Sequence, residues 1–519
     1  MTNENGNAAS FFVDRHRLSD YCGKAAFIEA DGKKRCLSYS DLAVQTGRMA
    51  ELYERHNIAR EDRAAMLVLD TIEFPVIFWG SLKSGVIPVP LNTLLGADVY
   101  EQILNDCRAT VLFVSDVLLP SVQGVLAHCS ALKKVIVIGE DFKEYASFAD
   151  ELDLCDERDA IEASDEEGAF WLYSSGSTGQ PKGVRHVHGS LRHTSDTYGA
   201  QVLGIAREDV VYSVAKCFFA YGLGNALSFP MSVGATTILL SGRPTPESVL
   251  DVINSTAPTI FCAVPTLYAA IVAHLESGSG SINTALRRCV SAGEALPEQI
   301  GLSWEKLTGC EILDGVGSTE MLHIFLSNQP GDVVYGTAGS AVPGYSLRLV
   351  NDQGDNCAVG EIGELLVKGN SAASDYWNKR DKSRATFEGV WTRTGDKYET
   401  RDDGRLIYCG RTDDMFKVSG IWVSPFEIEQ ALVSHEKVLE AAIVPAADEQ
   451  LLEKPKAYIV LKNQQTLHED DSSIERLKNE LKEHVKQQVG KWKYPRWIEI
   501  VPELPKTATG KIQRFKLRD

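Results

Sequence analysis

The feature that most constrains the fold is the alternation of short apolar runs with helical patterns through the first half of the chain. Each run is bounded by turn residues, which is typical of a buried strand, and residues 41–56 place apolar side chains at helical spacing. Alternating strands and helices predict an α/β fold with mostly parallel sheets. The predicted strands are 64–69, 86–90, 110–114, 135–138, 169–172, 237–240 and 259–264.

The length of the chain and a change in its sequence pattern near residue 400 predict two domains. A chain of 519 residues is too long for a single hydrophobic core. A turn signal at 401–404 precedes the stretch GRTDDMFKVSG, and the rest of the chain reads as a small α+β unit. We therefore expect an N-terminal domain over 1–412 and a C-terminal domain over 413–519. The C-terminal elements are predicted as strands 438–444, 456–462 and 496–501 and an amphipathic helix 472–489.

Composition narrows the class of protein. A hydrophobic content of 44% with 24% charged residues is ordinary for a globular protein, and a net charge of −18 argues against nucleic acid or an anionic membrane surface as the partner. No stretch approaches the ~20 apolar residues of a membrane helix, and the polar N-terminus lacks the pattern of a signal peptide. Eleven cysteines without a CxxC pair do not resemble a disulfide framework or a zinc site. We expect a cytoplasmic protein.

The run YSSGSTGQPKGV, residues 173–184, has the composition of a loop that holds a nucleotide triphosphate. Its glycines let the backbone approach an anion, its hydroxyls add hydrogen-bond donors, and Lys182 supplies a positive charge. A P-loop is excluded, because Lys182 lies between Pro181 and Gly183 and has no adjacent hydroxyl for magnesium. A flexible linker is disfavoured by the flanking apolar and basic residues.

This run resembles the phosphate-binding loop of the adenylate-forming superfamily, which includes acyl-CoA synthetases, peptide-synthetase adenylation domains and luciferases. The resemblance implies a large N-terminal domain of stacked sheets with flanking helices and a small, mobile α+β C-terminal domain. Further motifs follow in the order of the superfamily, at 291–296 (SAGEAL), 314–320 (DGVGSTE), 394–396 (TGD) and 506–511 (KTATGK).

The resemblance assigns the nucleotide-binding residues. Glu320 matches the glutamate that ligates magnesium, Asp396 the aspartate that binds the ribose, and Arg411 the arginine that assists it. Val316 departs from the pattern, since many members carry an aromatic residue there. By composition alone DGVGSTE is more often a simple turn, and Asp396 a surface carboxylate. The residues assigned to ATP or AMP are Ser174, Ser175, Gly176, Ser177, Thr178, Gly179, Lys182, Gly293, Glu294, Ala295, Asp314, Gly315, Val316, Ser318, Thr319, Asp396 and Arg411.

The catalytic set and the thiol-binding residues are assigned on the same grounds. Lys511 matches the lysine that contacts the acid's carboxylate and the α-phosphate, and acts with Glu320, Thr178 and Lys182 as the catalytic set. Asp413 matches the hinge about which the C-terminal domain swings between the two half-reactions. The coenzyme A channel is assigned to Lys417, Ser419, Gly420 and Trp422, although Lys417 could instead belong to a strand beside the hinge.

The acid is indicated by two aromatic-rich segments, FFAYGLGNALSFP and MLHIF, which closely resemble those of benzoate–CoA ligases. A short pocket closed by Tyr221 suits a flat ring and excludes a long acyl chain. No carboxylate nearby would hold a ring amino group, which favours benzoate over 2-aminobenzoate. His323 could instead be a core histidine. The resemblance places the ring against Ala220, Tyr221, Gly317, His323 and Ile324.

The predicted reaction is the ATP-dependent conversion of benzoate to benzoyl-AMP and then, with coenzyme A, to benzoyl-CoA, with Mg²⁺ as cofactor. The alternatives are a ligase for a related ring acid (hydroxybenzoate, fluorobenzoate, aminobenzoate or cyclohexanecarboxylate) and a stand-alone aryl acid adenylation enzyme. A peptide-synthetase module would require a separate carrier protein, because none follows Lys511. The resemblance also suggests control by a lysine acetyltransferase and deacetylase acting on Lys511. The sequence leaves the oligomeric state open, a dimer included.

Overall fold

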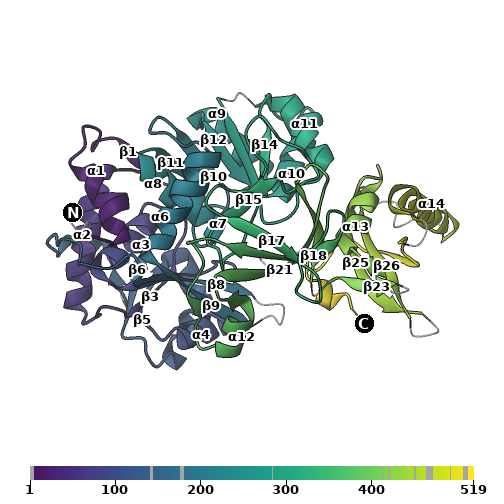
Figure 1. The fold of residues 1–519 in the computed structure, drawn as a ribbon. Helices are drawn as coiled ribbons and strands as arrows, with labels where there is room; N and C mark the ends of the chain where they lie inside the picture. Colours follow the sequence, from purple (N-terminus) through teal and green to yellow (C-terminus); the bar gives the residue numbers. More distant parts are fainter. Residues whose placement is uncertain are drawn as a thin grey trace.

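The computed structural model describes residues 5–140, 144–175, 180–282, 285–412, 414–418, 421–448, 452–462, 471–490, 493–506 and 512–518. Its large N-terminal part stacks sheets and helices, and a small α+β part lies at the other end of the molecule (Figure 1). The predicted α/β fold class is therefore confirmed. None of the described helices has the length and apolar character required to cross a membrane.

The largest sheet has nine strands and forms the centre of the N-terminal part. Its order is β16-β15-β14-β13-β12-β10-β11-β1-β2. The six strands from β14 to β1 run parallel, while β15, β16 and β2 are antiparallel additions at the edges. The bounds are β1 Ala25–Glu29, β2 Cys36–Ser38, β10 Val210–Ser213, β11 Thr236–Leu239, β12 Ile260–Ala263, β13 Arg288–Ala292, β14 Ile312–Gly317, β15 Ile324–Ser327 and β16 Ser340–Ala341.

Helices cover both faces of this sheet, as its almost wholly buried strands require. One face packs on the helices that follow β11, β12 and β13, and the other on the segments around Tyr198 and Phe229. These helical elements are α6 His188–Thr194, η4 Ser195–Val202, α7 Ala220–Leu223, η5 Gly224–Ser228, α8 Phe229–Val233, α9 Pro246–Thr256, α10 Pro265–Glu276 and α11 Glu298–Thr308.

A second parallel sheet, β4-β3-β5-β6-β7, lies beside the first. Helix α2, Tyr39–Arg55, begins at a capping box formed by Ser38 and Asp41, which satisfies backbone N–H groups at the start of the helix. It packs on α3, Glu73–Ser84. The strands are β3 Arg63–Leu67, β4 Ile87–Pro90, β5 Ala109–Ser115, β6 Lys134–Ile138 and β7 Ala146–Ser147, so the four strands predicted here are confirmed.

Two antiparallel units complete the N-terminal part. Strands β8, Gly168–Ser175, and β9, Pro181–Val187, form a hairpin to which β19, Asp375–Tyr376, adds at the β9 edge. A separate sheet pairs β17 Ser346–Val350, β18 Ile362–Lys368, β20 Phe387–Glu388, β21 Trp391–Thr400 and β22 Leu406–Arg411. The sequence predicted only the turn at 401–404, because these strands mix polar and apolar residues without a continuous buried run.

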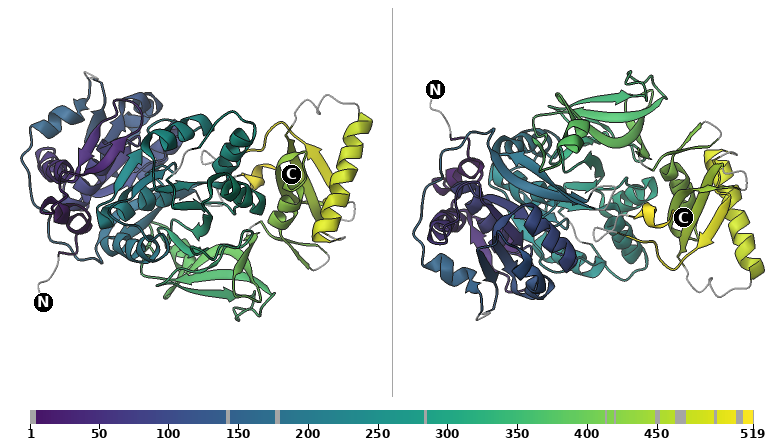
Figure 2. Two further views of the ribbon diagram at one scale, coloured as in Figure 1. Left: turned by 90° about the horizontal axis from the view of Figure 1, so that it is seen from above. Right: turned by 90° about the horizontal axis from the view of Figure 1, so that it is seen from below.

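The small C-terminal part has its own hydrophobic core and lies at one end of the molecule in both views of Figure 2. Its predicted strands and helix are confirmed. The Tyr408 and Phe426 rings meet at the junction, with centroids 5.1 Å apart. The elements are β23 Phe416–Val418, β24 Ile421–Val423, α13 Pro425–Val433, β25 Val438–Ala447, β26 Glu453–Leu461, α14 Asp471–Val489 and β27 Trp497–Ile500. The boundary at 412/413 stays a prediction.

Candidate active site

Two of the sequence motifs lie at the carboxyl ends of β13 and β14. Motif 291–296 begins in the last two residues of β13, and motif 314–320 continues β14 into a turn. Because neighbouring parallel strands end at the same edge of a sheet, the two motifs lie side by side, with Ala292 opposite Gly315.

The glycine-rich run connects two antiparallel strands. Ser174 and Ser175 end β8, Lys182 lies near the start of β9, and Ser174 is paired with Lys182. In a P-loop a helix follows the loop, so the strand β9 confirms that this run is not a P-loop. Gly176, Ser177, Thr178 and Gly179 lie outside the described residues.

Lys182 and Glu320 form the charged centre of the site. Nζ of Lys182 donates to Oε1 of Glu320 at 2.7 Å and to the Tyr376 hydroxyl at 2.9 Å. The Tyr376 hydroxyl in turn donates to the same Glu320 oxygen at 2.8 Å. Nζ also lies 4.2 Å from the centroid of the Tyr376 ring, within cation–π range. Three residues far apart in sequence therefore share one hydrogen-bonded cluster.

The ionisation of Glu320 follows from these contacts. Burial acts to raise the pKa of Glu320, but the positive charge of Lys182 and the hydrogen bonds from Lys182 and Tyr376 outweigh it, so the pKa lies below its ordinary value. Glu320 is a carboxylate at neutral pH, with an anionic oxygen available to a cation.

The turn that carries Glu320 is held from two sides. Nε2 of His186, on β9, lies 2.8 Å from the Thr319 carbonyl oxygen, and the Ala373 N–H donates to the Glu320 carbonyl at 2.8 Å. The Ser318 hydroxyl accepts from the Met321 N–H at 3.2 Å. Burial lowers the pKa of His186 to about 4, so this side chain is a neutral hydrogen-bond donor.

The predicted adenine segment lies open beside β14. Gly293 has a φ of +97°, and the nearest atom to a Cβ placed there would be 3.9 Å away, so its surroundings are open. Leu296 N–H donates to Oδ2 of Asp314 at 3.2 Å and ties this segment to β14. Burial raises the pKa of Asp314 to about 7. Val316 is half-buried and packs on the core, while Glu294 and Ala295 continue the segment beyond Gly293.

The two residues that are predicted to bind the ribose, Asp396 and Arg411, contact each other. Asp396 and Arg411 are opposite one another on β21 and β22, and Nη1 of Arg411 donates to Oδ1 of Asp396 at 3.0 Å. The same nitrogen donates to the Thr394 carbonyl at 3.1 Å.

The predicted acid-binding residues also come together. Nε2 of the buried His323 lies 3.2 Å from the Tyr221 carbonyl oxygen, and the His323 ring packs on Tyr198 and Phe229. Burial lowers its pKa to about 3, and its Nδ1 has no hydrogen-bond partner among the residues described. The Tyr221 hydroxyl donates to the carbonyls of Ala263 and Val290 at 3.2 and 3.0 Å, which fixes the ring against the sheet.

Small residues pack closely beside these aromatic rings. Gly317 is opposite Ile324 at the start of β15, and a Cβ on Gly317 would lie 2.7 Å from the His323 carbonyl oxygen. Ala220 begins α7 one residue before Tyr221 and is partly buried. The residues predicted to bind the acid therefore form one packed cluster that includes two aromatic rings, close in the chain to the Glu320 turn.

Several predicted residues cannot be placed. Asp413, Ser419, Gly420 and Lys511 lie outside the described residues, as do the side chains of Lys417 and Trp422. The backbones of Lys417 and Trp422 pair across the β23–β24 hairpin. The hinge, the catalytic lysine and the coenzyme A channel therefore stay predictions.

Sequence reasoning missed two residues of the site, Tyr376 and His186. His186 carried a usable signal, because residues four apart in a strand share a face and Lys182 precedes it by four. No sequence signal pointed to Tyr376. It lies 194 residues after Lys182 and reaches the site only because β19 pairs with β9.

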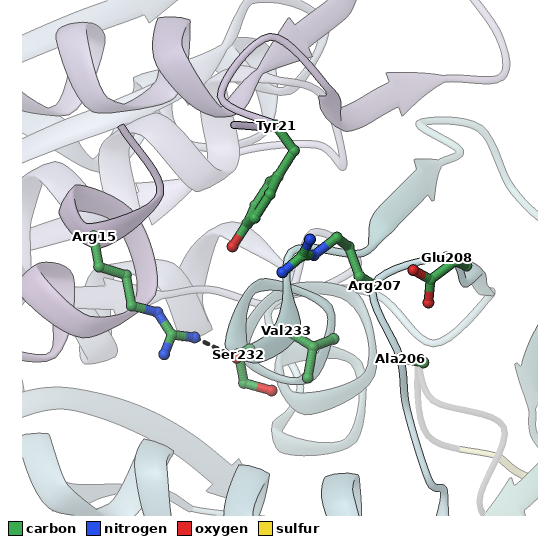
Figure 3. Close-up of a pocket in the computed structure, with 7 residues that line it drawn as sticks. All are labelled: Arg15, Tyr21, Ala206, Arg207, Glu208, Ser232 and Val233. Atoms are coloured by element: carbon green, nitrogen blue, oxygen red, sulfur yellow. Dashed lines mark hydrogen bonds between the residues drawn. The ribbon is translucent and has the colours of Figure 1, made fainter. Parts of the chain in front are cut away.

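A surface pocket of about 500 Å³ is distinct from this site (Figure 3). Its wall residues 206–208 and 232–233 precede β10 and β11, so it opens near the amino ends of these strands, whereas the motifs lie at the carboxyl ends. It contains none of the motif residues. Its lining consists of Arg15, Tyr21, Ala206, Arg207, Glu208, Ser232 and Val233.

Comparison with known families agrees with this geometry. Residues 15–377 match the AMP-binding enzyme family, and residues 427–511 match the AMP-binding enzyme C-terminal domain. The chain belongs to the AMP-binding enzyme family.

Individual members are similar along the whole chain. A 4-hydroxybenzoate–CoA/benzoate–CoA ligase of Rhodopseudomonas palustris is 50% identical, over 99% of this chain and 94% of its own length. The crystal structure of a benzoate CoA ligase from Burkholderia xenovorans LB400 is 44% identical with a TM-score of 0.89, covering 99% of this chain and all of that one. An anthranilate CoA ligase bound to anthranoyl-AMP is 39% identical with a TM-score of 0.92, covering 98% and 96% of the two chains.

Proposed function

We propose that this AMP-binding enzyme is an AMP-forming aryl-CoA ligase with benzoate as its preferred acid. The observation that carries the proposal is the 50% identity to a benzoate- and 4-hydroxybenzoate-activating ligase over 99% of the chain. The contact between the Tyr221 and His323 rings, with centroids 5.6 Å apart, supports a flat ring as the substrate, because aromatic side chains favour packing against another aromatic ring.

In the first half-reaction the carboxylate of the acid attacks the α-phosphorus of ATP and pyrophosphate leaves. Negative charge accumulates on the phosphate oxygens, so catalysis consists mainly of positioning and cationic stabilisation. Lys182 and the hydroxyls of the 174–178 run bind the leaving phosphates. Asp396 accepts from the ribose hydroxyls, and Arg411 orients it through the 3.0 Å hydrogen bond.

Magnesium fits the residues present. One ionised carboxylate, completed by phosphate oxygens and water, is the donor set that Mg²⁺ prefers at nucleotide sites, and Glu320 is that carboxylate. The described residues contain no cluster of three or more His, Cys, Asp or Glu that would hold a metal without the nucleotide. When bound, the ion would neutralise charge on the β- and γ-phosphates.

The second half-reaction forms the thioester from the adenylate and coenzyme A and releases AMP. We assign Lys511 to the first half-reaction and the 417–422 hairpin to the thiol channel, with a swing of the C-terminal domain about Asp413 between them. Acetylation of Lys511 would then block adenylation by removing its charge. Thioester formation from preformed benzoyl-AMP would survive acetylation, and equal loss of both half-reactions would refute this form of control.

Pyrophosphate release with a panel of acids tests the proposal. Benzoate, 4-hydroxybenzoate, 2-aminobenzoate, cyclohexanecarboxylate and a medium-chain fatty acid are compared with and without coenzyme A. We expect the highest kcat/KM for benzoate, and sustained turnover only when coenzyme A is present. Preference for the fatty acid would overturn the acid assignment, and sustained turnover without coenzyme A would overturn the ligase assignment.

A further inference from the structure

We propose that Tyr376 is a positioning residue for nucleotide binding, which holds Glu320 for the metal and Lys182 for the phosphates. The proposal deepens the proposed function and rests on its ATP-dependent step, but not on the identity of the acid. Among the described residues, Tyr376 is the side chain that contacts both charged groups of the cluster.

The contacts of Tyr376 use its hydroxyl and its ring separately. The hydroxyl donates to Oε1 of Glu320 at 2.8 Å and accepts from Nζ of Lys182 at 2.9 Å. The ring faces the same ammonium group at 4.2 Å. A hydroxyl that donates to a carboxylate fixes the orientation of that carboxylate. The face of an aromatic ring can hold a cation in place after the carboxylate that neutralised it has bound another ion.

Tyr376 is itself firmly held. The two residues of β19 pair with Arg185 and Val184 of β9, and Arg185 binds Asp375 through two hydrogen bonds of 2.6 Å. The Trp377 N–H donates to the Gly183 carbonyl at 2.8 Å. The Tyr376 side chain is 3% exposed and packs on Phe387. It is therefore anchored to the strand that carries Lys182.

Before nucleotide binds, Lys182 and Glu320 neutralise each other. A triphosphate that approaches alone must displace Glu320 from Lys182 and then face an uncompensated carboxylate. A magnesium-bound triphosphate provides a cation for Glu320 and anionic oxygens for Lys182, so both charges keep a partner. Tyr376 stays in contact with both groups through this exchange. Removal of its hydroxyl and removal of its ring should therefore weaken nucleotide binding in two different ways.

Nucleotide affinity, measured by calorimetry with α,β-methylene-ATP and with AMP over a series of magnesium concentrations, tests the proposal. Tyr376→Phe keeps the ring and loses the hydrogen bond to Glu320. We expect the magnesium concentration for half-maximal binding of the ATP analogue to rise about tenfold, the effect of one charge-assisted hydrogen bond. AMP lacks the β- and γ-phosphates, so its affinity should change less than about twofold.

Tyr376→Leu also removes the ring. At saturating magnesium we expect Tyr376→Phe to keep its affinity for the ATP analogue and Tyr376→Leu to lose affinity. An unchanged magnesium dependence in Tyr376→Phe would overturn the proposal. So would equal weakening of AMP and the ATP analogue, which is the behaviour of general structural damage.

Tyr53→Phe is the matched control. It removes a buried tyrosine hydroxyl bonded to Ser81 at 2.6 Å in the core beside the second sheet, far from the site in sequence, and should leave both affinities unchanged. Failure of the acid panel would refute the substrate assignment and leave this test intact, because the binding measurements contain no acid.

Discussion

Gly224→Ala places a methyl group directly against the predicted acid pocket. Gly224 has helical dihedral angles, φ −62° and ψ −57°, so alanine suits the backbone and by itself would stabilise the helix by up to about 1 kcal/mol. Its Cβ, however, would lie 2.3 Å from Cδ2 and 2.7 Å from Nε2 of His323. The imidazole must move by about 1 Å to restore ordinary contact, and Tyr198 and Phe229 pack on it.

Overpacking of this kind costs about 1–3 kcal/mol, and the 3.2 Å contact between His323 and the Tyr221 carbonyl adds about 1 kcal/mol if lost. After the gain in helix propensity, the net cost is about 1–3 kcal/mol, or a factor of about 5 to 150. The displaced ring moves toward the predicted acid pocket, so we expect kcat/KM for benzoate to fall by up to about that factor, and any part of the cost that the pocket does not take up to lower the thermal stability. The KM for ATP stays within about twofold, since the nucleotide contacts lie on other residues.

Steady-state pyrophosphate release over a benzoate series, together with thermal unfolding, measures both effects. Gly124→Ala is the control, because a Cβ there has no atom within 4 Å. Unchanged kcat/KM for benzoate with unchanged thermal stability would refute the packing argument. A loss confined to ATP binding would show that His323 serves the nucleotide rather than the acid.

Two other predictions concern buried polar side chains. His186 and His323 have pKa values of about 4 and 3, below the ordinary 6.5, so the unfolded chain binds more protons and stability is lost as the pH falls from 6.5 toward 4, by up to about 1.4 kcal/mol per pH unit for each residue. Urea unfolding at several pH values measures this slope, and His186→Gln should reduce it; the same slope in the variant would contradict the assignment. Tyr221→Phe removes a donor to two sheet carbonyls and should cost about 1–2 kcal/mol of stability, while KM for benzoate changes less than about threefold. A much larger rise in KM with unchanged stability would mean that the hydroxyl contacts the acid.

Much of the fold could be predicted from the sequence because buried parallel strands are continuous apolar runs. The four predicted strands of the second sheet all form, and so do those at 237–240 and 259–264. The antiparallel sheet over 346–411 could not be predicted beyond its turn, since its strands are half-buried and are defined by pairing partners distant in sequence.

The sequence by itself determined which motifs the chain carries and their order. The glycine-rich run has residue types that suit phosphate, while the roles predicted for Glu320, Asp396 and Arg411 follow from the resemblance to the superfamily. Only the tertiary structure decided how they meet. Lys182 and Glu320 are 138 residues apart, and the hydroxyl that joins them comes from Tyr376, which a two-residue strand adds to the edge of β9. Such contacts depend on backbone pairing between distant segments, for which no local pattern of side chains is required.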